Sequence, residues 1–223
     1  MKIAVVTGGG HGIGRALCRR LAADGLTVVV ADIDKDAAKT VSDEIGGHAY
    51  PLDVSDGTAF EAMIDYVEAN IGPIDLFVSN AGTGSNETVA EAADEKWQYY
   101  WDLHVMAAVR LSRGLVPLMQ ARGGGVIINN ASICAKQPLD YEPIYNVTKA
   151  ALMMFSKNLS EEVIGDHIRV NCINPGPSKT ALHIRAYPAS KKNDSLPVPE
   201  QYKAMFLYLM SNDLQQTGYC FIP

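Results

Sequence analysis

The sequence lacks several features that would mark particular classes of protein. It contains no run of Lys and Arg, and a formal net charge of −6 with a pI near 5.3 argues against a dedicated nucleic-acid binder. No apolar run approaches the roughly 20 residues that span a bilayer. The apolar stretch at residues 3–6 is too short for a signal-peptide core, and glycines follow it closely. We therefore expect a cytoplasmic protein with no membrane partner.

Cysteine is scarce and forms no recognisable motif. No CxxC occurs and no His lies nearby at ligand spacing, so no metal site is predicted. The four cysteines are interpreted as small buried apolar residues in a reducing compartment: Cys18, Cys134, Cys172 and Cys220. With 48% hydrophobic and 20% charged residues, the composition is that of an ordinary globular protein. A length of 223 residues allows one domain or two small ones.

A glycine-rich turn follows the first apolar run. Residues 2–7 are apolar and rich in Val, and they stop at Gly8–Gly14. An amphipathic pattern then runs to Gly25 and predicts a helix. A strand, a glycine turn and a helix together offer unpaired backbone N–H groups and a positive helix end to a pyrophosphate. A turn that binds nothing is the structural alternative.

The second apolar run, residues 26–31, ends at Asp32. From this position a carboxylate can accept hydrogen bonds from an adenosine ribose, and it would repel a 2′-phosphate. Because Ile33 rather than an Arg follows, we predict NAD as the cofactor in preference to NADP. A cap for the next helix is the alternative role of Asp32, although Asp34 is better placed for it.

Apolar strands and helices alternate along the rest of the chain. Further strands are predicted at 49–52, 75–79, 126–130, 168–173 and 219–222, with helices at 36–45, 55–71, 94–121, 143–165 and 200–210. Ser55 or Asp56 is expected to cap its helix and Pro117 to kink the long one. The chain is predicted to form a single domain over residues 1–223 with a short substrate loop near 178–199. Its fold class is a doubly wound α/β sheet of about seven parallel strands with helices on both faces.

Tyr145 and Lys149 lie four residues apart in a predicted helix, so their side chains can point into one site. A phenol has an unperturbed pKa of about 10. A neighbouring cation favours the phenolate, so Lys149 is expected to lower the pKa of Tyr145 and make its oxygen a usable proton acceptor and donor. An amphipathic surface pair is the alternative.

The chain resembles the short-chain dehydrogenase/reductase family. The resemblance rests on five motifs in the family's order: Thr7-Gly8-x-x-x-Gly12-Ile13-Gly14, Asn80-Ala81-Gly82, Ser132, Tyr145-x-x-x-Lys149 and Pro175-Gly176. It covers essentially the whole chain and implies a Rossmann fold. It also implies an NAD-dependent oxidoreductase that interconverts an alcohol and a ketone or aldehyde.

The resemblance implies a role for each motif. Tyr145 would be the acid–base, Lys149 would hydrogen-bond the nicotinamide ribose, and Ser132 would hold the substrate oxygen. The remaining residues would bind the cofactor. The pyrophosphate would be surrounded by Gly8, Gly12, Ile13 and Gly14, and the adenosine would contact Asp32, Asp53 and Val54. The neighbouring ribose would contact Asn80, Ala81 and Gly82, and the nicotinamide end would contact Pro175, Gly176 and Thr180.

Two departures from the family pattern stand out. His104 occupies a place where the family usually has an Asn that helps hold a water linked to the active-site Lys. A His could replace that catalytic relay or make it pH-sensitive, and a buried His without such a role is the alternative. The segment after Gly176 is compact, and no glycine-containing tail follows Ile222. We therefore expect a more open pocket and altered subunit contacts.

The expected partners are a small alcohol or carbonyl substrate and further copies of the chain, as a dimer or tetramer. Candidate pocket residues carry both charges and indicate no substrate preference: Cys134, Lys136, Gln137, Asp140, Tyr141, His183 and Arg185. A dehydratase or epimerase is an alternative within the same fold. A catalytically slow NAD-binding regulatory or assembly protein is an alternative from another class, against which the complete set of Ser132, Tyr145 and Lys149 argues.

Overall fold

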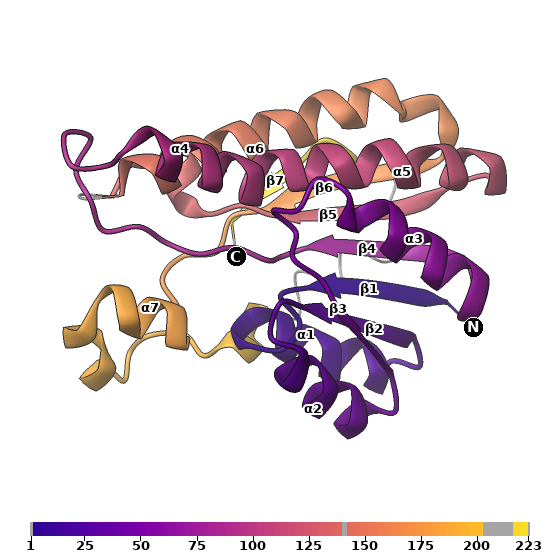
Figure 1. The fold of residues 1–223 in the computed structure, drawn as a ribbon, viewed down its shortest axis with the longest axis horizontal. Coiled ribbons are helices and arrows are strands. Elements are labelled where there is room, and N and C mark those ends of the chain that lie inside the picture. The colour runs from indigo at the N-terminus through magenta and orange to yellow at the C-terminus, as the bar shows by residue number, and fades with distance from the viewer. Residues whose placement is uncertain (1, 140–141, 203–215, 223) are drawn as a thin grey trace.

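The computed structural model describes residues 2–139, 142–202 and 216–222, in which seven strands form one parallel sheet (Figure 1). The strands are β1 (Ile3–Thr7), β2 (Thr27–Asp32), β3 (His48–Pro51), β4 (Ile74–Ser79), β5 (Gly125–Asn130), β6 (Ile168–Ile173) and β7 (Cys220–Phe221). Their spatial order is β3-β2-β1-β4-β5-β6-β7. The direction of winding reverses between β1 and β4, so the predicted doubly wound Rossmann sheet is confirmed. In such sheets a binding crevice forms beyond the carboxyl ends of the strands at the reversal.

Helices cover both faces of this sheet. They are α1 (Gly12–Ala23), α2 (Lys35–Ile45), α3 (Ala59–Asn70), α4 (Asp94–Trp101), α5 (Ala107–Arg122), α6 (Pro143–Glu162) and α7 (Ala181–Ala186). A π-helical turn, η1 (Asp102–Met106), joins α4 to α5. The 3-10 turns are η2 (Ile133–Ala135), η3 (Ile164–Asp166), η4 (Pro188–Lys192) and η5 (Pro199–Tyr202). Figure 1 shows α1 and α2 on one side of the sheet and α3, α5 and α6 on the other.

Successive side chains of the central strands enter two separate apolar cores. Val5 of β1 belongs to the core formed with α3 and α5, whereas its neighbour Val6 packs with Leu17 and Leu21 of α1. Because both faces of the strands are buried, their sequences are continuously apolar rather than alternating. No helix in the described part of the chain is long and apolar enough to cross a membrane.

Three details of the predicted elements differ in the structure. The long helix is interrupted by a π-turn at residues 102–106, which was not predicted. Pro117 lies within α5, and its kink stays a prediction. The predicted caps of α3 are also wrong. Asp56 accepts hydrogen bonds from the N–H and hydroxyl of Thr58 (both 2.9 Å), and this local turn delays the helix until Ala59. The predicted helix 200–210 begins as η5, and its residues 203–210 lie outside the described residues.

Candidate active site

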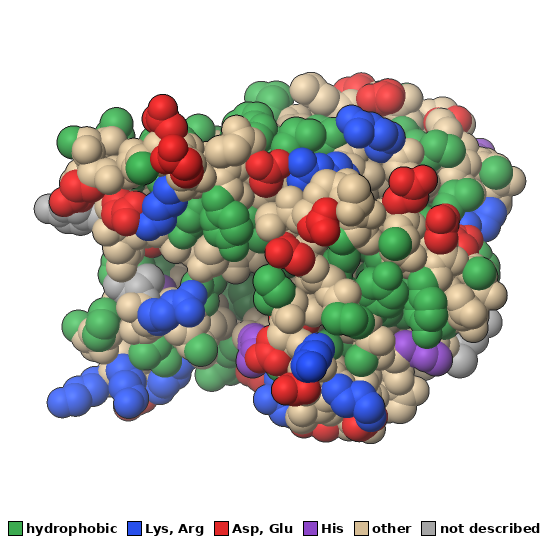
Figure 2. Space-filling view, viewed as in Figure 1, with side chains coloured by type: hydrophobic (Ala, Val, Ile, Leu, Met, Phe, Trp, Pro, Cys, Tyr) green, Lys and Arg blue, Asp and Glu red, His purple; other side chains and the backbone are tan. Residues whose placement is uncertain are grey.

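A cavity of about 390 Å³ opens at the carboxyl edge of the sheet, at the point where the winding reverses. Figure 2 shows a hollow beside the segment that carries α7 and η4. Lys and Arg side chains gather on the surface of this segment. The volume lies in the range of small-molecule and cofactor pockets. Most of the predicted site residues line it: Gly8, Gly12, Ile13, Asp32, Asp53, Val54, Asn80, Ala81, Gly82, Ser132, Tyr145, Lys149, Pro175, Gly176 and Thr180.

Close packing shapes the glycine turn between β1 and α1. Gly8 has φ +63°, a left-handed conformation that favours glycine. A Cβ atom on Gly14 would lie 2.1 Å from the carbonyl oxygen of Gly8, so only glycine lets α1 pack against the turn. Gly14 therefore lies beneath the turn rather than in the cavity wall. Gly12 begins α1 and lines the cavity, which places the unpaired N–H groups of the first helical turn where a pyrophosphate could accept from them.

The carboxylate of Asp32 holds this turn in place. The side chain is 6% exposed; Oδ2 accepts from the N–H of Gly10 (2.9 Å) and Oδ1 from the N–H of Asp34 (3.0 Å). Asp34 is the residue that caps α2, since its Oδ1 accepts from the N–H groups of Asp36 and Ala37. The alternative role of Asp32 as a helix cap is therefore wrong, and its charge stays at the cavity wall.

Asn80, at the end of β4, joins the glycine turn to two strands. Its Nδ2 donates to the carbonyl oxygens of Thr7 (2.9 Å) and Gly8 (3.3 Å), and its Oδ1 accepts from Nδ2 of Asn130 (2.7 Å). The hydroxyl of Thr7 in turn accepts from the N–H of Asn80 (3.0 Å). Asn80 therefore fixes the glycine turn, and it also lines the cavity, where its predicted contact with the ribose stays a prediction.

Ser132, Tyr145 and Lys149 share one wall of the cavity. Ser132 follows β5, and its side chain is hydrogen-bonded with that of Tyr145 while its Oγ accepts from the N–H of Cys134 (3.2 Å). The amine of Lys149 lies 5.6 Å from the centre of the Tyr145 ring. It donates to the carbonyl oxygen of Asn130 at 2.9 Å. The fold thus brings together the end of one strand and one face of α6, as the helical spacing predicts.

Desolvation sets the protonation state of this group. It raises the pKa of Tyr145 above its usual value of 10 and lowers the pKa of Lys149 from 10.5 to about 8. The prediction that Lys149 lowers the pKa of Tyr145 below its usual value is wrong for the protein without a cofactor, because desolvation outweighs the hydrogen bond with Ser132 that lowers the pKa. Tyr145 is therefore a neutral phenol at neutral pH, and a neutral phenol has a proton that it can donate.

His104 lies in the π-turn behind Tyr145, with the two rings edge to face and their centroids 5.6 Å apart. The N–H of Thr83 donates to Nε2 (3.3 Å), which leaves the proton on Nδ1, 2.9 Å from the hydroxyl oxygen of Thr148. Burial, and the charge of Lys149, hold the pKa of His104 well below 6.5. A ring buried in one neutral form does not titrate near neutrality, which argues against a pH-sensitive relay. That His104 replaces the Asn of the family in the relay stays a prediction.

Glu142 is a cavity residue that the sequence analysis missed. It lies just before α6, is 4% exposed and lines the cavity. Burial raises the pKa of its carboxyl group, and a hydrogen bond with Tyr187 acts in the opposite direction. Spacing could have found it, because residues 142, 145 and 149 fall on one helical face.

The other candidate pocket residues divide into three groups. Cys134 and His183 line the cavity, whereas Lys136, Gln137 and Arg185 are not among its lining residues. Asp140 and Tyr141 lie outside the described residues.

A glycine turn at the carboxyl edge of a doubly wound sheet, beside a Ser–Tyr–Lys group, defines a dinucleotide-binding oxidoreductase. Residues 2–191 match the family model described as short chain dehydrogenase. The chain belongs to the short-chain dehydrogenase/reductase family, whose members use a nicotinamide dinucleotide.

Individual relatives agree in sequence and fold. The chain is 46% identical to L-sorbose reductase from Gluconobacter frateurii, solved with NADPH and L-sorbose, with a TM-score of 0.90 over 100% of this chain and 94% of that one. It is 28% identical to a 3-ketoacyl-(acyl-carrier-protein) reductase from Brucella melitensis complexed with NADH, with a TM-score of 0.93 over 99% and 96% of the two chains. It is also 33% identical over 183 residues to the 3-oxoacyl-(acyl-carrier-protein) reductase of Escherichia coli, covering 81% of this chain and 75% of the relative.

Proposed function

We propose that this chain reduces a ketone to an alcohol, with Tyr145 as the proton donor. The observation that carries this proposal is the convergence of Ser132, Tyr145 and Lys149 in a cavity that the glycine turn also lines. A bound reduced nicotinamide would supply the hydride to the carbonyl carbon. The neutral Tyr145 hydroxyl donates its proton to the carbonyl oxygen, and Ser132 hydrogen-bonds the same oxygen. Lys149, with a pKa of about 8, offers the charge that stabilises the phenolate left behind.

We propose NAD(H) as the preferred dinucleotide. Asp32 places a negative charge at the cavity wall, which opposes a 2′-phosphate, and the neighbouring Ile33 is 69% exposed and brings no compensating cation. Both carboxylate oxygens of Asp32 already accept backbone N–H groups. The discrimination is therefore expected to act through charge rather than through bonds to the ribose, and to be modest.

The test is a screen of ketones and alcohols with both cofactors, followed at the nicotinamide absorbance. We expect ketone reduction with a higher kcat/KM for NADH than for NADPH. A strong preference for NADPH would contradict the role given to Asp32. Tight NADH binding without turnover of any ketone or alcohol would contradict the reductase and favour the slow NAD-binding protein instead.

We propose a polyhydroxy ketone as the substrate class. Glu142 places a buried carboxyl group on the same helical face as Tyr145, and it lies beside Tyr187 in the cavity wall. Beyond its hydrogen bond with Tyr187, this carboxyl group has further lone pairs that can accept from substrate hydroxyl groups, and each such bond to a buried polar atom is favourable. The relative from Gluconobacter frateurii was solved with a ketose, L-sorbose, which supports this choice.

Substitution of Glu142 separates substrate recognition from catalysis. Glu142→Gln keeps the shape of the side chain but weakens its acceptor strength. We expect kcat/KM for a ketose to fall by about tenfold, the order of a lost charged hydrogen bond. A simple ketone such as cyclohexanone should be affected less than twofold, which makes it the control substrate. Equal losses for both substrates would contradict recognition of hydroxyl groups by Glu142.

We propose that residues 1–223 act as one NAD(P)-binding domain whose substrate loop lies near 178–199, and that copies of the chain associate as a dimer or tetramer. The four cysteines are free thiols, which suits the proposed cytoplasmic location. Light scattering at several protein concentrations would test the assembly.

A further inference from the structure

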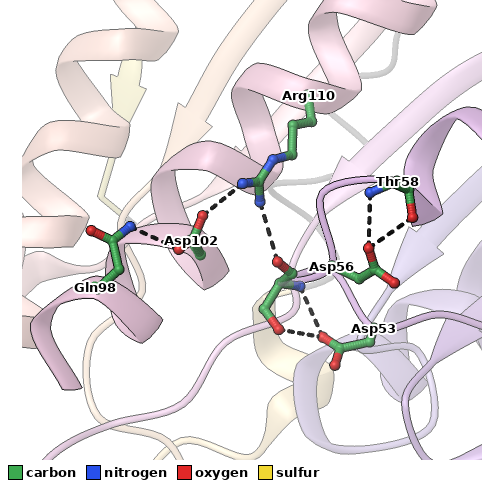
Figure 3. A network of polar contacts seen from close by, with 7 residues as sticks. Asp53, Asp56, Thr58, Gln98, Asp102 and Arg110 are labelled. Carbon is green, nitrogen blue, oxygen red and sulfur yellow. Dashed lines mark hydrogen bonds and ion pairs between the residues drawn. The ribbon is translucent and has the colours of Figure 1, made fainter. Parts of the chain in front are cut away.

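Arg110 lies at the centre of a polar network between two parts of the site (Figure 3). Its guanidinium donates through Nη2 to Oδ1 of Asp102 (2.7 Å) and through Nη1 to the carbonyl oxygen of Ser55 (3.3 Å). The side chains of Arg110 and Asp102 are only 19% and 23% exposed. One side chain of α5 thus connects the loop after β3 with the π-turn η1.

The pairing of Asp102 with Arg110 depends on the π-turn. In a regular α-helix, residues about seven apart return to the same face after two turns. A π-turn admits an extra residue, so here residues eight apart share a face. Asp102 begins this turn, and its other oxygen accepts from Nε2 of Gln98 at 2.8 Å. The hydrogen bond from Gln98, followed by that from Arg110, keeps the pKa of Asp102 below its usual value. The ion pair between Asp102 and Arg110 therefore stabilises the π-turn that carries His104.

The second contact of Arg110 supports the loop at the adenosine end of the cavity. Ser55 donates to Oδ1 of Asp53 through its N–H (2.9 Å) and its hydroxyl (2.6 Å), and Asp53 and Val54 line the cavity. The guanidinium also lies 3.7 Å from where a Cβ of Gly57 would be, so it packs directly against the loop.

We propose that Arg110 is a positioning residue that fixes the adenine-binding loop and the π-turn behind Tyr145 as one unit. The inference rests on the proposed use of a nicotinamide dinucleotide, with Asp53 and Val54 at the adenine edge as the family resemblance implies. Without Arg110 the loop loses its link to α5, and the part of the dinucleotide that touches the loop is held less tightly. The nicotinamide half, held by α6 and the end of β6, depends less on Arg110.

The test compares NADH with reduced nicotinamide mononucleotide, which lacks the adenosine half. Binding of each is measured by nicotinamide fluorescence to Arg110→Met and to a matched control, Arg122→Met. Arg122 lies at the far end of α5, where it pairs with Glu68 (2.7 Å) and donates to the carbonyl oxygen of Ile74 (2.8 Å) with similar exposure. Its loss should destabilise the fold comparably without touching the loop.

We expect Arg110→Met to weaken NADH binding about tenfold, the order of lost hydrogen bonds from a charged group, while leaving mononucleotide binding within about twofold. Arg122→Met should change neither. Arg110→Lys can make one of the two contacts, so its NADH affinity should lie between those of wild type and Arg110→Met. If Arg110→Met does not fold, Arg110→Lys replaces it in the test.

Two results would overturn the inference. If Arg110→Met and Arg122→Met bind both ligands alike, Arg110 has only a general structural role. If wild-type protein binds NADH no more tightly than the mononucleotide, the adenine assignment itself falls, and the proposed cofactor site falls with it.

Discussion

The two ends of the cavity are built in different ways. At the proposed adenosine and pyrophosphate end, the wall relies on backbone N–H groups, small residues and the hydrogen bonds of Asp32. At the catalytic end, it relies on buried side chains from distant elements, namely His104, Ser132 and Lys149. Steric fit determines the structure of the first end, whereas the cost of burying polar groups determines the properties of the second. Substitutions at the two ends should therefore fail for different reasons.

The largest effect is expected at the steric end. In Gly14→Ala the new Cβ would lie 2.1 Å from the carbonyl oxygen of Gly8, and backbone atoms would have to move. We expect unfolding to become easier by about 4 kcal/mol or more, together with loss of NADH binding. Urea unfolding and NADH titration would measure both.

Gly165→Ala is the matched control, because no atom lies within 4 Å of its added Cβ. It should leave stability and NADH binding close to those of wild type. Unchanged NADH affinity in Gly14→Ala would show that steric fit does not determine this end of the cavity.

The next effect concerns the buried amine at the catalytic end. Because the folded pKa of Lys149 is about 8 and the usual value is 10.5, the folded protein holds fewer protons than the unfolded chain between these values. The charged amine therefore costs stability in full below pH 8, and the cost disappears as pH rises towards 10.5. Its upper value is about 3 kcal/mol.

Lys149→Met removes that cost. The variant also loses the hydrogen bond to the carbonyl oxygen of Asn130, and this loss does not depend on pH. We therefore expect the free energy of unfolding of the variant, compared with that of wild type, to fall as the pH rises from 8 towards 10.5. Turnover should nevertheless fall by about 10²-fold or more, since the phenolate of Tyr145 loses its stabilising charge. A difference in stability between the two proteins that stays constant from pH 8 to 10.5 would contradict the claim that burial of the charged amine is costly.

A smaller effect is expected at His104. His104→Gln can keep an acceptor for the N–H of Thr83 but not the ring contact with Tyr145. We expect kcat/KM to fall by about tenfold, the order of one misplaced buried hydrogen bond. Because the ring is neutral, the shape of the pH–rate profile between pH 5.5 and 7.5 should be the same in both proteins. An inflection near 6.5 in wild type that the variant lacks would show that His104 titrates.

Much of the steric end could be predicted from the sequence because its causes are local. Glycines, the strand before them and the helix after them occur within one short stretch, and the cap formed by Asp34 needs only the N–H groups two and three residues further on. The alternation of apolar strands and helices likewise predicts the doubly wound sheet.

Less of the catalytic end of the cavity could be predicted from the sequence. The spacing of Tyr145 and Lys149 placed them on one face, but their pKa values depend on burial by residues far away in the sequence. The π-turn was missed because it has no local signature of the kind that Pro117 offers. The spacing of Glu142 to Tyr145 was available in the sequence, but its burial and its hydrogen bond with Tyr187 depend on the folded cavity wall.

The central claim is that Tyr145 gives its proton to the substrate in a site that binds the dinucleotide independently of it. Tyr145→Phe tests this most directly, by NADH titration and by turnover of a ketone on the same preparation. We predict NADH binding within about twofold of wild type and turnover reduced by about 10²- to 10⁴-fold, the usual contribution of a positioned acid. Turnover equal to that of wild type would contradict the account.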